Sequence, residues 1–211
     1  MSSFGSSCED MHVVKVGGSL LDYERLVEVV ERFIELEGGS KVLIVVGGAR
    51  SADAVRTIDR NYGLDEERAH WLAVRGMSLN AYLLAEVLDG AELVDQIGRC
   101  ESVWEQGGIA IVEPIAWLES DEANGCGVEH CWLFTSDSIA AHVAKQIGTK
   151  RLTMLKSTLP VEQLQDAEHA ASIGLVDGRF AEIIPGIENV TLINGRSEAM
   201  EAMTLNAGVH V

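Results

Sequence analysis

The chain has 211 residues, of which 47% are hydrophobic and 23% charged, and its formal net charge is −17. This composition is typical of a soluble globular protein with a sizeable core, so we expect one domain over residues 11–211 behind a disordered leader at residues 1–10. The acidic surplus disfavours nucleic acid and anionic membranes as partners, although a local group of lysines and glycine amides can still bind a small anion.

The four cysteines do not form a recognisable framework. They stand at positions 8, 100, 126 and 131 without CxxC spacing, so we expect reduced thiols in a cytoplasmic protein. Cys126, His130 and Cys131 are close enough in sequence to suggest a metal site. No second ligand pair follows at zinc spacing, so we interpret this segment as a loop and expect no metal. No apolar run approaches the roughly 18 residues of a membrane span, which predicts no membrane partner.

Strand-like and helix-like segments alternate along the first half of the chain. The β-branched run at 11–18 predicts a strand, and residues 22–38 predict an amphipathic helix. The nearly all-apolar run at 41–48 is typical of a strand buried on both faces of a parallel sheet. A long helical region follows over 51–88, with a break near 61–67.

The alternation continues in the second half. We expect a helix at 135–148 and strands at 91–97, 108–118 (ending near Pro114), 151–157, 188–195 and 207–211. Such alternation predicts an α/β protein, a three-layer αβα sandwich with a mainly parallel central sheet. Ligands of such sheets bind at the carboxyl ends of the strands.

The first two predicted strands both end on paired glycines. In Lys15-Val-Gly17-Gly18-Ser19, the glycines let the backbone approach a ligand, Ser19 can cap a helix or bond a phosphate oxygen, and Lys15 projects near the same point. An ordinary turn after an edge strand explains the same residues equally well.

The second turn has the same backbone freedom and adds a guanidinium suited to bidentate binding of phosphate or carboxylate. It comprises Gly47, Gly48, Ala49 and Arg50. Asp53 and Arg56 follow at helical spacing. For these two residues we favour an exposed salt-bridge ladder over a binding role.

Two later segments carry charged residues at the ends of elements. Thr135 or Ser136 suits a helix N-cap, and Asp137 stands in the first turn, where a carboxylate most often serves only the helix terminus. A role for Asp137 beyond the helix terminus is favoured because a lysine in the strand layer needs an anionic partner. Lys156 and Ser157 end a predicted strand, where they would meet a nucleotide's phosphates or simply be exposed.

Taken in order, these motifs resemble the amino acid kinase family, which includes acetylglutamate, aspartate, carbamate and uridylate kinases. The matching segments are Lys15 to Ser19, the Gly47-Gly48 pair, Ser136 to Ala141, and residues 190–195. Within the family the chain resembles most the short branch of aminomethylfuran phosphate kinases, which is linked to methanofuran and tetrahydromethanopterin one-carbon metabolism. That resemblance is carried by residues 69–71, 132–144 and 155–157.

The resemblance implies an ATP-dependent kinase that transfers the γ-phosphoryl group to a carboxylate or phosphate acceptor. It implies Mg²⁺ held chiefly by ATP and water, and an assembly of identical chains. Residue by residue, it assigns catalysis to Lys15 and Asp137, nucleotide binding to Gly17, Gly18, Ser19, Ser136, Lys156 and Ser157, and acceptor binding to Gly47, Gly48, Ala49 and Arg50.

Some features depart from the larger relatives or leave alternatives open. The late lysine of some relatives is not evident, and Lys156 is the candidate to replace it. Asp22, His70, Trp71 and Arg75 are candidates for lining the acceptor pocket. A non-catalytic nucleotide- or oxyanion-binding or storage protein of the same fold is the alternative function, which the lysine and aspartate pair disfavours. A dinucleotide oxidoreductase is weaker still, because neither glycine pair extends to GxGxxG.

Overall fold

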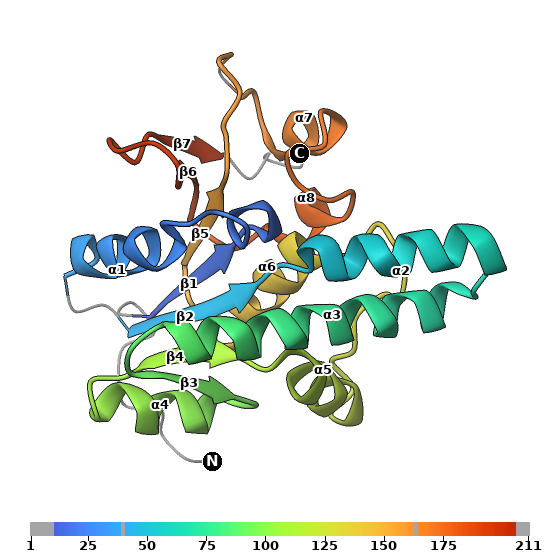
Figure 1. The fold of residues 1–211 in the computed structure, drawn as a ribbon, viewed down its shortest axis with the longest axis horizontal. Helices are drawn as coiled ribbons and strands as arrows, with labels where there is room; N and C mark the ends of the chain where they lie inside the picture. Colours follow the sequence, from blue (N-terminus) through green and yellow to red (C-terminus); the bar gives the residue numbers. More distant parts are fainter. Residues whose placement is uncertain (1–10, 39–40, 163, 206–211) are drawn as a thin grey trace.

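A computed structural model describes residues 11–38, 41–162 and 164–205, and its central element is a seven-stranded sheet (Figure 1). The predicted leader at 1–10 and the predicted strand at 207–211 lie outside the described residues. The strands are β1 Met11–Val16, β2 Lys41–Val46, β3 Ala91–Val94, β4 Ile109–Val112, β5 Arg151–Lys156, β6 Asn189–Asn194 and β7 Ala202–Leu205.

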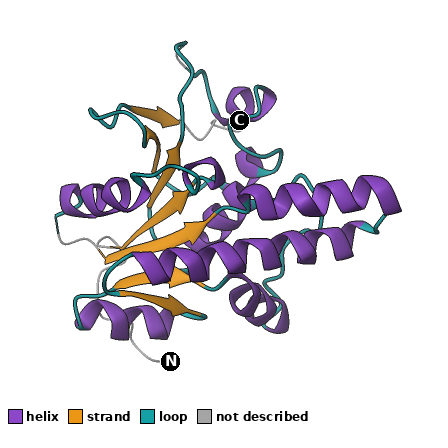
Figure 2. Ribbon diagram, in the orientation of Figure 1, coloured by secondary structure: helices purple, strands orange, loops and turns teal. Residues whose placement is uncertain are grey.

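The sheet order is β3-β4-β2-β1-β5-β6-β7, and only the β6–β7 pair is antiparallel. Helices cover the sheet (Figure 2), which confirms the predicted α/β class with a mainly parallel sheet. The helices are α1 Leu26–Leu36, α2 Ala49–Tyr62, α3 Glu66–Val87, α4 Ile97–Glu105, α5 Pro114–Ala123, α6 Ser136–Gln146, α7 Ala167–Ser172 and α8 Phe180–Ile183, with a 3-10 turn, η2, at Gly18–Leu20.

Side-chain alternation divides the core into two clusters, one on each face of the sheet. On β1, Val13 belongs to the cluster that contains the apolar residues of α6, whereas Val14 and Val16 belong to the cluster that contains those of α1. Successive side chains of a strand point to opposite faces, so Lys15 points to the same face as Val13. The strand period therefore directs this buried lysine toward α6.

The long helices α2 and α3 form an antiparallel pair that extends past the carboxyl ends of the strands (Figure 1). Gly63 closes α2 with a φ of +63°, and the Asp65 side chain accepts a hydrogen bond from the amide of Arg68 to start α3. The predicted break near 61–67 is thereby confirmed.

The chain near residue 114 differs from the expectation. The strand predicted at 108–118 ends at Val112, because α5 begins at Pro114, where a missing N–H is tolerated, and the Glu113 side chain accepts from the amide of Ala116. Residue 97, expected to end a strand, instead starts α4. The short helices α7 and α8 are not among the predicted elements.

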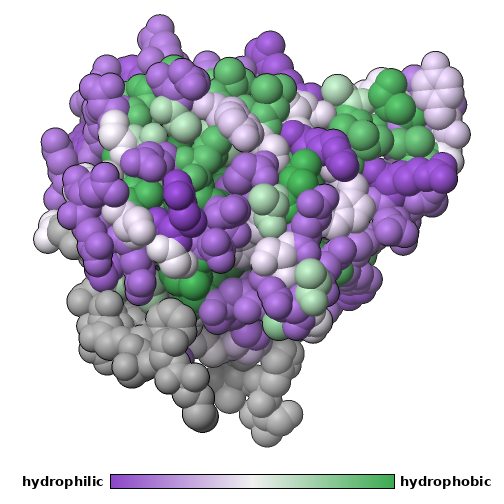
Figure 3. Space-filling view, turned by 90° about the horizontal axis from the view of Figure 1, so that it is seen from below, coloured by the Kyte–Doolittle hydropathy of each residue, from purple (hydrophilic) through white to green (hydrophobic). Residues whose placement is uncertain are grey.

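Viewed from below, the surface is mainly hydrophilic with separate apolar patches (Figure 3). In the part of the chain that the structure describes, no helix is both long enough and apolar enough to cross a bilayer.

Candidate functional site

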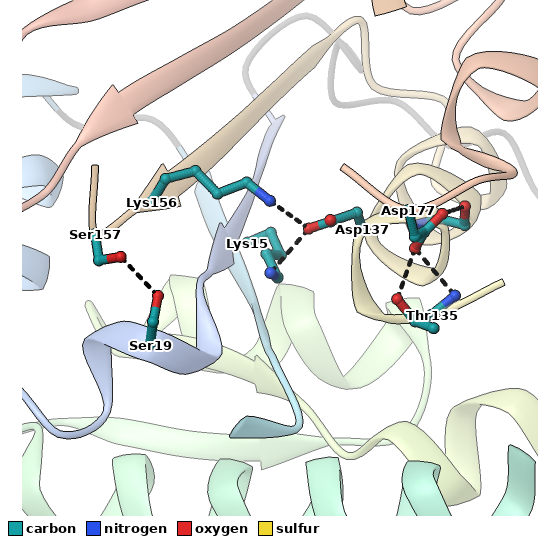
Figure 4. A network of polar contacts seen from close by, with 8 residues as sticks. Lys15, Ser19, Thr135, Asp137, Lys156, Ser157 and Asp177 are labelled. Atoms are coloured by element: carbon teal, nitrogen blue, oxygen red, sulfur yellow. Dashed lines mark hydrogen bonds and ion pairs between the residues drawn. The ribbon is translucent and has the colours of Figure 1, made fainter. Parts of the chain in front are cut away.

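Two buried charges and a half-buried one meet at the carboxyl end of the sheet. Lys15 on β1 and Lys156 at the end of β5 both direct their ammonium groups at Asp137 in the first turn of α6 (Figure 4). Asp137 Oδ1 lies 2.8 Å from Lys15 Nζ and 2.9 Å from Lys156 Nζ. Two cations thus share one carboxylate oxygen, and the cluster carries a net positive charge. The predicted convergence of positions 15 and 137 is observed.

The cluster shifts the protonation equilibria of its members. Burial alone would raise the pKa of Asp137, but the two ammonium groups, that of Lys15 first, outweigh burial and hold it at about 2. Burial lowers the pKa of Lys156 to about 8, with repulsion from Lys15 as the next cause and attraction to Asp137 opposing both. At neutral pH all the charges needed to attract an anion are present.

The start of α6 is stabilised by a residue far away in the chain. Asp177 accepts hydrogen bonds from the amide (3.0 Å) and the hydroxyl (2.9 Å) of Thr135 (Figure 4). It also accepts from the amide (2.9 Å) and the hydroxyl of Ser138. Thr135 occupies the N-cap position, as predicted, but its own side chain makes no capping hydrogen bond. Because Asp177 satisfies the helix terminus, Asp137 is free to face the lysines.

The two glycine turns pack directly against each other. A Cβ added at Gly18 would come within 2.6 Å of the Ala49 amide nitrogen, and one at Gly47 within 2.8 Å of the Gly18 nitrogen. Neither position has room for a side chain, so the pairing of the turns itself requires glycine. Ala49, in this contact, adopts a φ of +46°, a strained conformation for a residue with a Cβ.

The amide groups of these turns are only partly available to a ligand. Gly17 donates its N–H to Leu155 O at 2.8 Å, and Gly47 donates to Val16 O at 2.9 Å. The resemblance assigns Gly17 to nucleotide binding, but its amide is not available to a phosphate, because the end of the neighbouring strand β5 already accepts from that donor. Gly17 shapes the turn, and Ser19 beside it donates a hydrogen bond to the Ser157 hydroxyl (2.8 Å).

A buried asparagine that is not among the predicted site residues holds the second turn. Asn80 on α3 donates from Nδ2 to Gly47 O at 2.7 Å and to Gly48 O at 2.9 Å. One amide group thus fixes both carbonyls of the turn. Like Asp177, Asn80 contacts residues more than 30 positions away, and no local sequence pattern reveals such a contact.

A cavity of about 240 Å³ lies beside the turns and the start of α6. Its wall includes, from the predicted residues, Gly18, Ser19, Gly48, Ala49 and Ser136, and further residues from α2, α3 and the segment before α6. Most of the side chains from α3 and from residues 131–134 are apolar or aromatic. A small molecule in this cavity would lie next to the glycine turns.

Several predicted residues occupy other places. Arg50 is not part of the cavity wall; its side chain is 84% exposed and pairs with Asp22 at 3.0 Å. Asp53 and Arg56 form the expected exposed ion pair (2.9 Å), yet both also line the cavity. Of the other candidates for the acceptor pocket, His70 lines this cavity, whereas Trp71 and Arg75 line a shallower depression between α3 and α5.

The cysteine-containing segment before α6 has no metal-ligand geometry. Cys126 is exposed and Cys131 is buried, and neither forms a disulfide. Among the described residues, no three histidine, cysteine, aspartate or glutamate side chains are grouped so as to hold a metal ion. His130 instead stacks on His70, with ring centroids 4.9 Å apart.

Two solved structures with a similar fold are kinases. The uridylate kinase of Archaeoglobus fulgidus superposes with a TM-score of 0.58 at 16% identity, covering 93% of this chain and 91% of that one. The UMP kinase of Bacillus anthracis superposes with a TM-score of 0.61 at 14% identity, covering 93% of this chain and 99% of that one. At this identity the similarity establishes the fold.

Sequence comparisons are more specific. A family model described as "Amino acid kinase family" matches residues 10–161. The (5-(aminomethyl)furan-3-yl)methyl phosphate kinase of Methanocaldococcus jannaschii is 30% identical over 197 residues, which cover 88% of each chain. The present chain therefore belongs to the amino acid kinase family and is a phosphotransferase.

Proposed function

We propose that this protein is an ATP-dependent small-molecule kinase whose transferred phosphoryl group passes beside Lys15. The observation that carries the proposal is the shared carboxylate: the ammonium groups of Lys15 and Lys156 meet one oxygen of Asp137. The other described carboxylate that acts on Lys156, that of Asp177, already accepts hydrogen bonds from the start of α6, so the described contacts leave a surplus of positive charge. Keeping surplus charge in a buried place costs stability unless a bound anion compensates it. The triphosphate of ATP is such an anion.

The surroundings of the cluster suit a nucleotide on one side and an acceptor on the other. Ser19 and Ser157 place two hydroxyls beside the ends of β1 and β5, where phosphate oxygens would accept hydrogen bonds. The cavity opens on the other side, at Gly48, Ala49 and Ser136. Its volume suits a small acceptor.

The described carboxylates near the turns already have cationic or helix-terminal partners. Asp137 binds the lysines, Asp177 binds the start of α6, and Asp53 pairs with Arg56. A magnesium ion that arrives with ATP fits this site if phosphate oxygens and water supply most of its ligands, as Mg²⁺ prefers. When bound, it would neutralise charge on the phosphates.

In the proposed reaction, an oxygen of the acceptor forms a bond to the γ-phosphorus while the bond to the β,γ-bridging oxygen breaks. Charge spreads over the moving group, and Lys15 and Lys156 neutralise it. Asp137 positions both ammonium groups and does not itself touch the phosphoryl group. Catalysis then rests on placement and electrostatics.

For the acceptor, we propose a small phosphorylated ring compound of the class named for the M. jannaschii relative, an aminomethylfuran phosphate, with a role in one-carbon carrier biosynthesis. Support comes from the 30% identity over most of both chains. A carboxylate acceptor is the second candidate, because it presents the same anionic oxygen.

The decisive experiment replaces Lys15 and measures ATP-dependent phosphorylation of this aminomethylfuran phosphate. Lys15→Met keeps the buried aliphatic stem and leaves Asp137 paired with Lys156, so the fold should persist. We expect kcat to fall at least about 100-fold, the equivalent of about 3 kcal/mol of transition-state stabilisation.

Lys41→Met is the matched control, since Lys41 starts the neighbouring strand β2 at the opposite end of the sheet. We expect it to keep the wild-type rate. Undiminished turnover in Lys15→Met would refute the proposed role of this lysine. Binding of oxyanions by the wild-type protein without any response to ATP and magnesium would instead favour the storage alternative.

A further inference from the structure

One histidine in the cavity wall has an unused ring nitrogen. His70 on α3 is 3% exposed and lines the cavity beside the second glycine turn. Its Nε2 is buried and has no hydrogen-bond partner among the described residues. Buried polar atoms nearly always have partners, so this one needs an explanation.

The groups around the ring keep His70 uncharged. The ring of His130 stacks on it at 4.9 Å with an interplanar angle of 19°, and Trp71 meets it edge-on at 5.7 Å. His130 Nε2 lies 2.5 Å from Glu122 Oε1, although the direction does not complete a hydrogen bond. Burial, and secondarily His130, lowers the pKa of His70 to about 4, so the imidazole is neutral at pH 7.

The remaining contact fixes the tautomer. A hydrogen bond to the backbone of Cys131 raises the pKa of His70, which is the effect of a carbonyl that accepts from the ring. Since Nε2 has no partner, we assign the ring hydrogen to Nδ1, toward the backbone of Cys131. In a neutral imidazole with a protonated Nδ1, Nε2 is a hydrogen-bond acceptor only.

We propose that His70 Nε2 accepts a hydrogen bond from a donor group, preferably a primary ammonium, on the phosphoryl acceptor in the cavity. The inference rests on the proposed kinase function and names a specificity determinant within it. The carboxylate of Glu122, near His130, favours a cationic donor, whereas the charge of Asp53 in the cavity wall is already paired with Arg56. The apolar side chains of Val74 and Met77 suit the body of a small ring.

A ligand without the donor leaves Nε2 buried and unpaired. Sites built to bond a polar group reject analogues that lack it more strongly than apolar pockets reject a missing methylene. The cavity should therefore discriminate between two ring phosphates that differ only in an amino group.

The test compares two probes by calorimetric titration: the aminomethylfuran phosphate named above and its analogue with a methyl group in place of the aminomethyl group. We expect the wild-type protein to bind the amine at least about tenfold more tightly. His70→Asn can replace Nδ1 but cannot reach the place of Nε2, so it should lose this preference. His70→Gln can place its amide oxygen near that of Nε2 and should retain part of the preference.

A buried histidine elsewhere provides the control for general damage. His12 is 4% exposed on β1, and both of its ring nitrogens are bonded, to Glu37 and Thr153. His12→Phe should lower the melting temperature yet keep the wild-type preference for the amine.

Either of two results would overturn the inference: a wild-type protein without preference for the amine, or a His70→Asn variant that preserves it. The kinase function is tested separately, by measuring whether the wild-type protein transfers phosphate from ATP. A protein that turns over ATP but shows no preference disproves only the role of His70.

Discussion

Strands β1 and β5 carry a buried polar cluster at each end, and the two clusters differ in their balance of charge. At the amino end, His12 bonds Glu37 and Thr153 at 2.9 Å each, and Glu37 also pairs with Arg151. Burial lowers the pKa of His12, so among the described residues one cation there, Arg151, meets one anion, Glu37. At the carboxyl end, two lysines contact one described carboxylate, that of Asp137.

This difference separates a structural cluster from a binding cluster. The amino-end groups satisfy one another, and no further charge is needed for their neutrality. The carboxyl-end lysines keep a surplus charge beside two packed turns that line a cavity, and a bound anion would balance that charge. Strongly perturbed charges beside a cavity are typical of functional sites.

The largest effect is expected from Asp137→Asn, which removes the anion from the carboxyl-end cluster. Two ammonium groups would then lie within the same buried space without a carboxylate. We expect the free energy of unfolding to fall by about 3 kcal/mol or more. We also expect kcat to fall by a larger factor than the KM for ATP rises, because the lysines lose their positions. Denaturant unfolding and steady-state kinetics measure the two effects.

The loss of stability in Asp137→Asn should depend on pH in a defined direction. The folded-state pKa of Asp137 is about 2, against an ordinary 3.8, so the carboxylate stabilises the fold fully above about pH 4. That contribution disappears as the pH falls through about 2. Wild-type and variant proteins should therefore converge in stability toward acid. A difference that stays constant between pH 6 and pH 2 would contradict the lysine–aspartate assignment.

Rules about strand ends made part of this site predictable. Lys15 and Lys156 are each found near the carboxyl end of a predicted strand, and parallel strands bring those ends together. Asp137 was identifiable because a lysine in a strand layer requires an anion. The fold was predictable from the alternation of strand-like and helix-like apolar segments. The short helices were not predictable, because they are too short to show a helical period of apolar residues.

The rest of the site depends on contacts that no local pattern specifies. In the sequence, Asn80 is one polar residue of a helical segment and Asp177 an ordinary loop residue. Only the folded chain shows that Asn80 bonds the second glycine turn and that Asp177 bonds the start of α6. Arg50 illustrates the converse: its place after the glycine pair suggested a ligand, but the first turn of α2 points it outward to Asp22. Whether a side chain in the first turn of a helix points to the site or to solvent depends on how the helix is rotated about its axis, and the glycine motif does not determine that rotation.

A smaller effect, on stability alone, is expected from Glu37→Gln at the amino-end cluster. The variant loses the charge that His12 and Arg151 share, while the isosteric amide keeps the packing. We expect the free energy of unfolding to drop by about 1 to 3 kcal/mol, with kcat within about twofold of wild type. Thermal unfolding and the same kinase assay test this. Loss of turnover at full stability would show that the two clusters are not functionally separate.

The smallest effect concerns the alkaline side of the pH profile. Since the pKa of Lys156 is lowered to about 8, its ammonium form is lost as the pH rises through 8, and kcat/KM for ATP should fall about threefold between pH 7.5 and 8.5. Lys156→Arg retains its charge over this range, so its profile should stay flat there even if its absolute rate is lower.

Stability should change in the opposite direction over the same range. Lys156 binds its proton less strongly in the folded chain (about 8) than in the unfolded chain (10.5), so wild-type stability should rise as the pH goes from 8 toward 10.5. Activity that falls while stability rises is the signature of a cation retained for a ligand at the expense of the fold. A Lys156→Arg profile with the same alkaline decline would assign that decline to another group and remove Lys156 from phosphate binding.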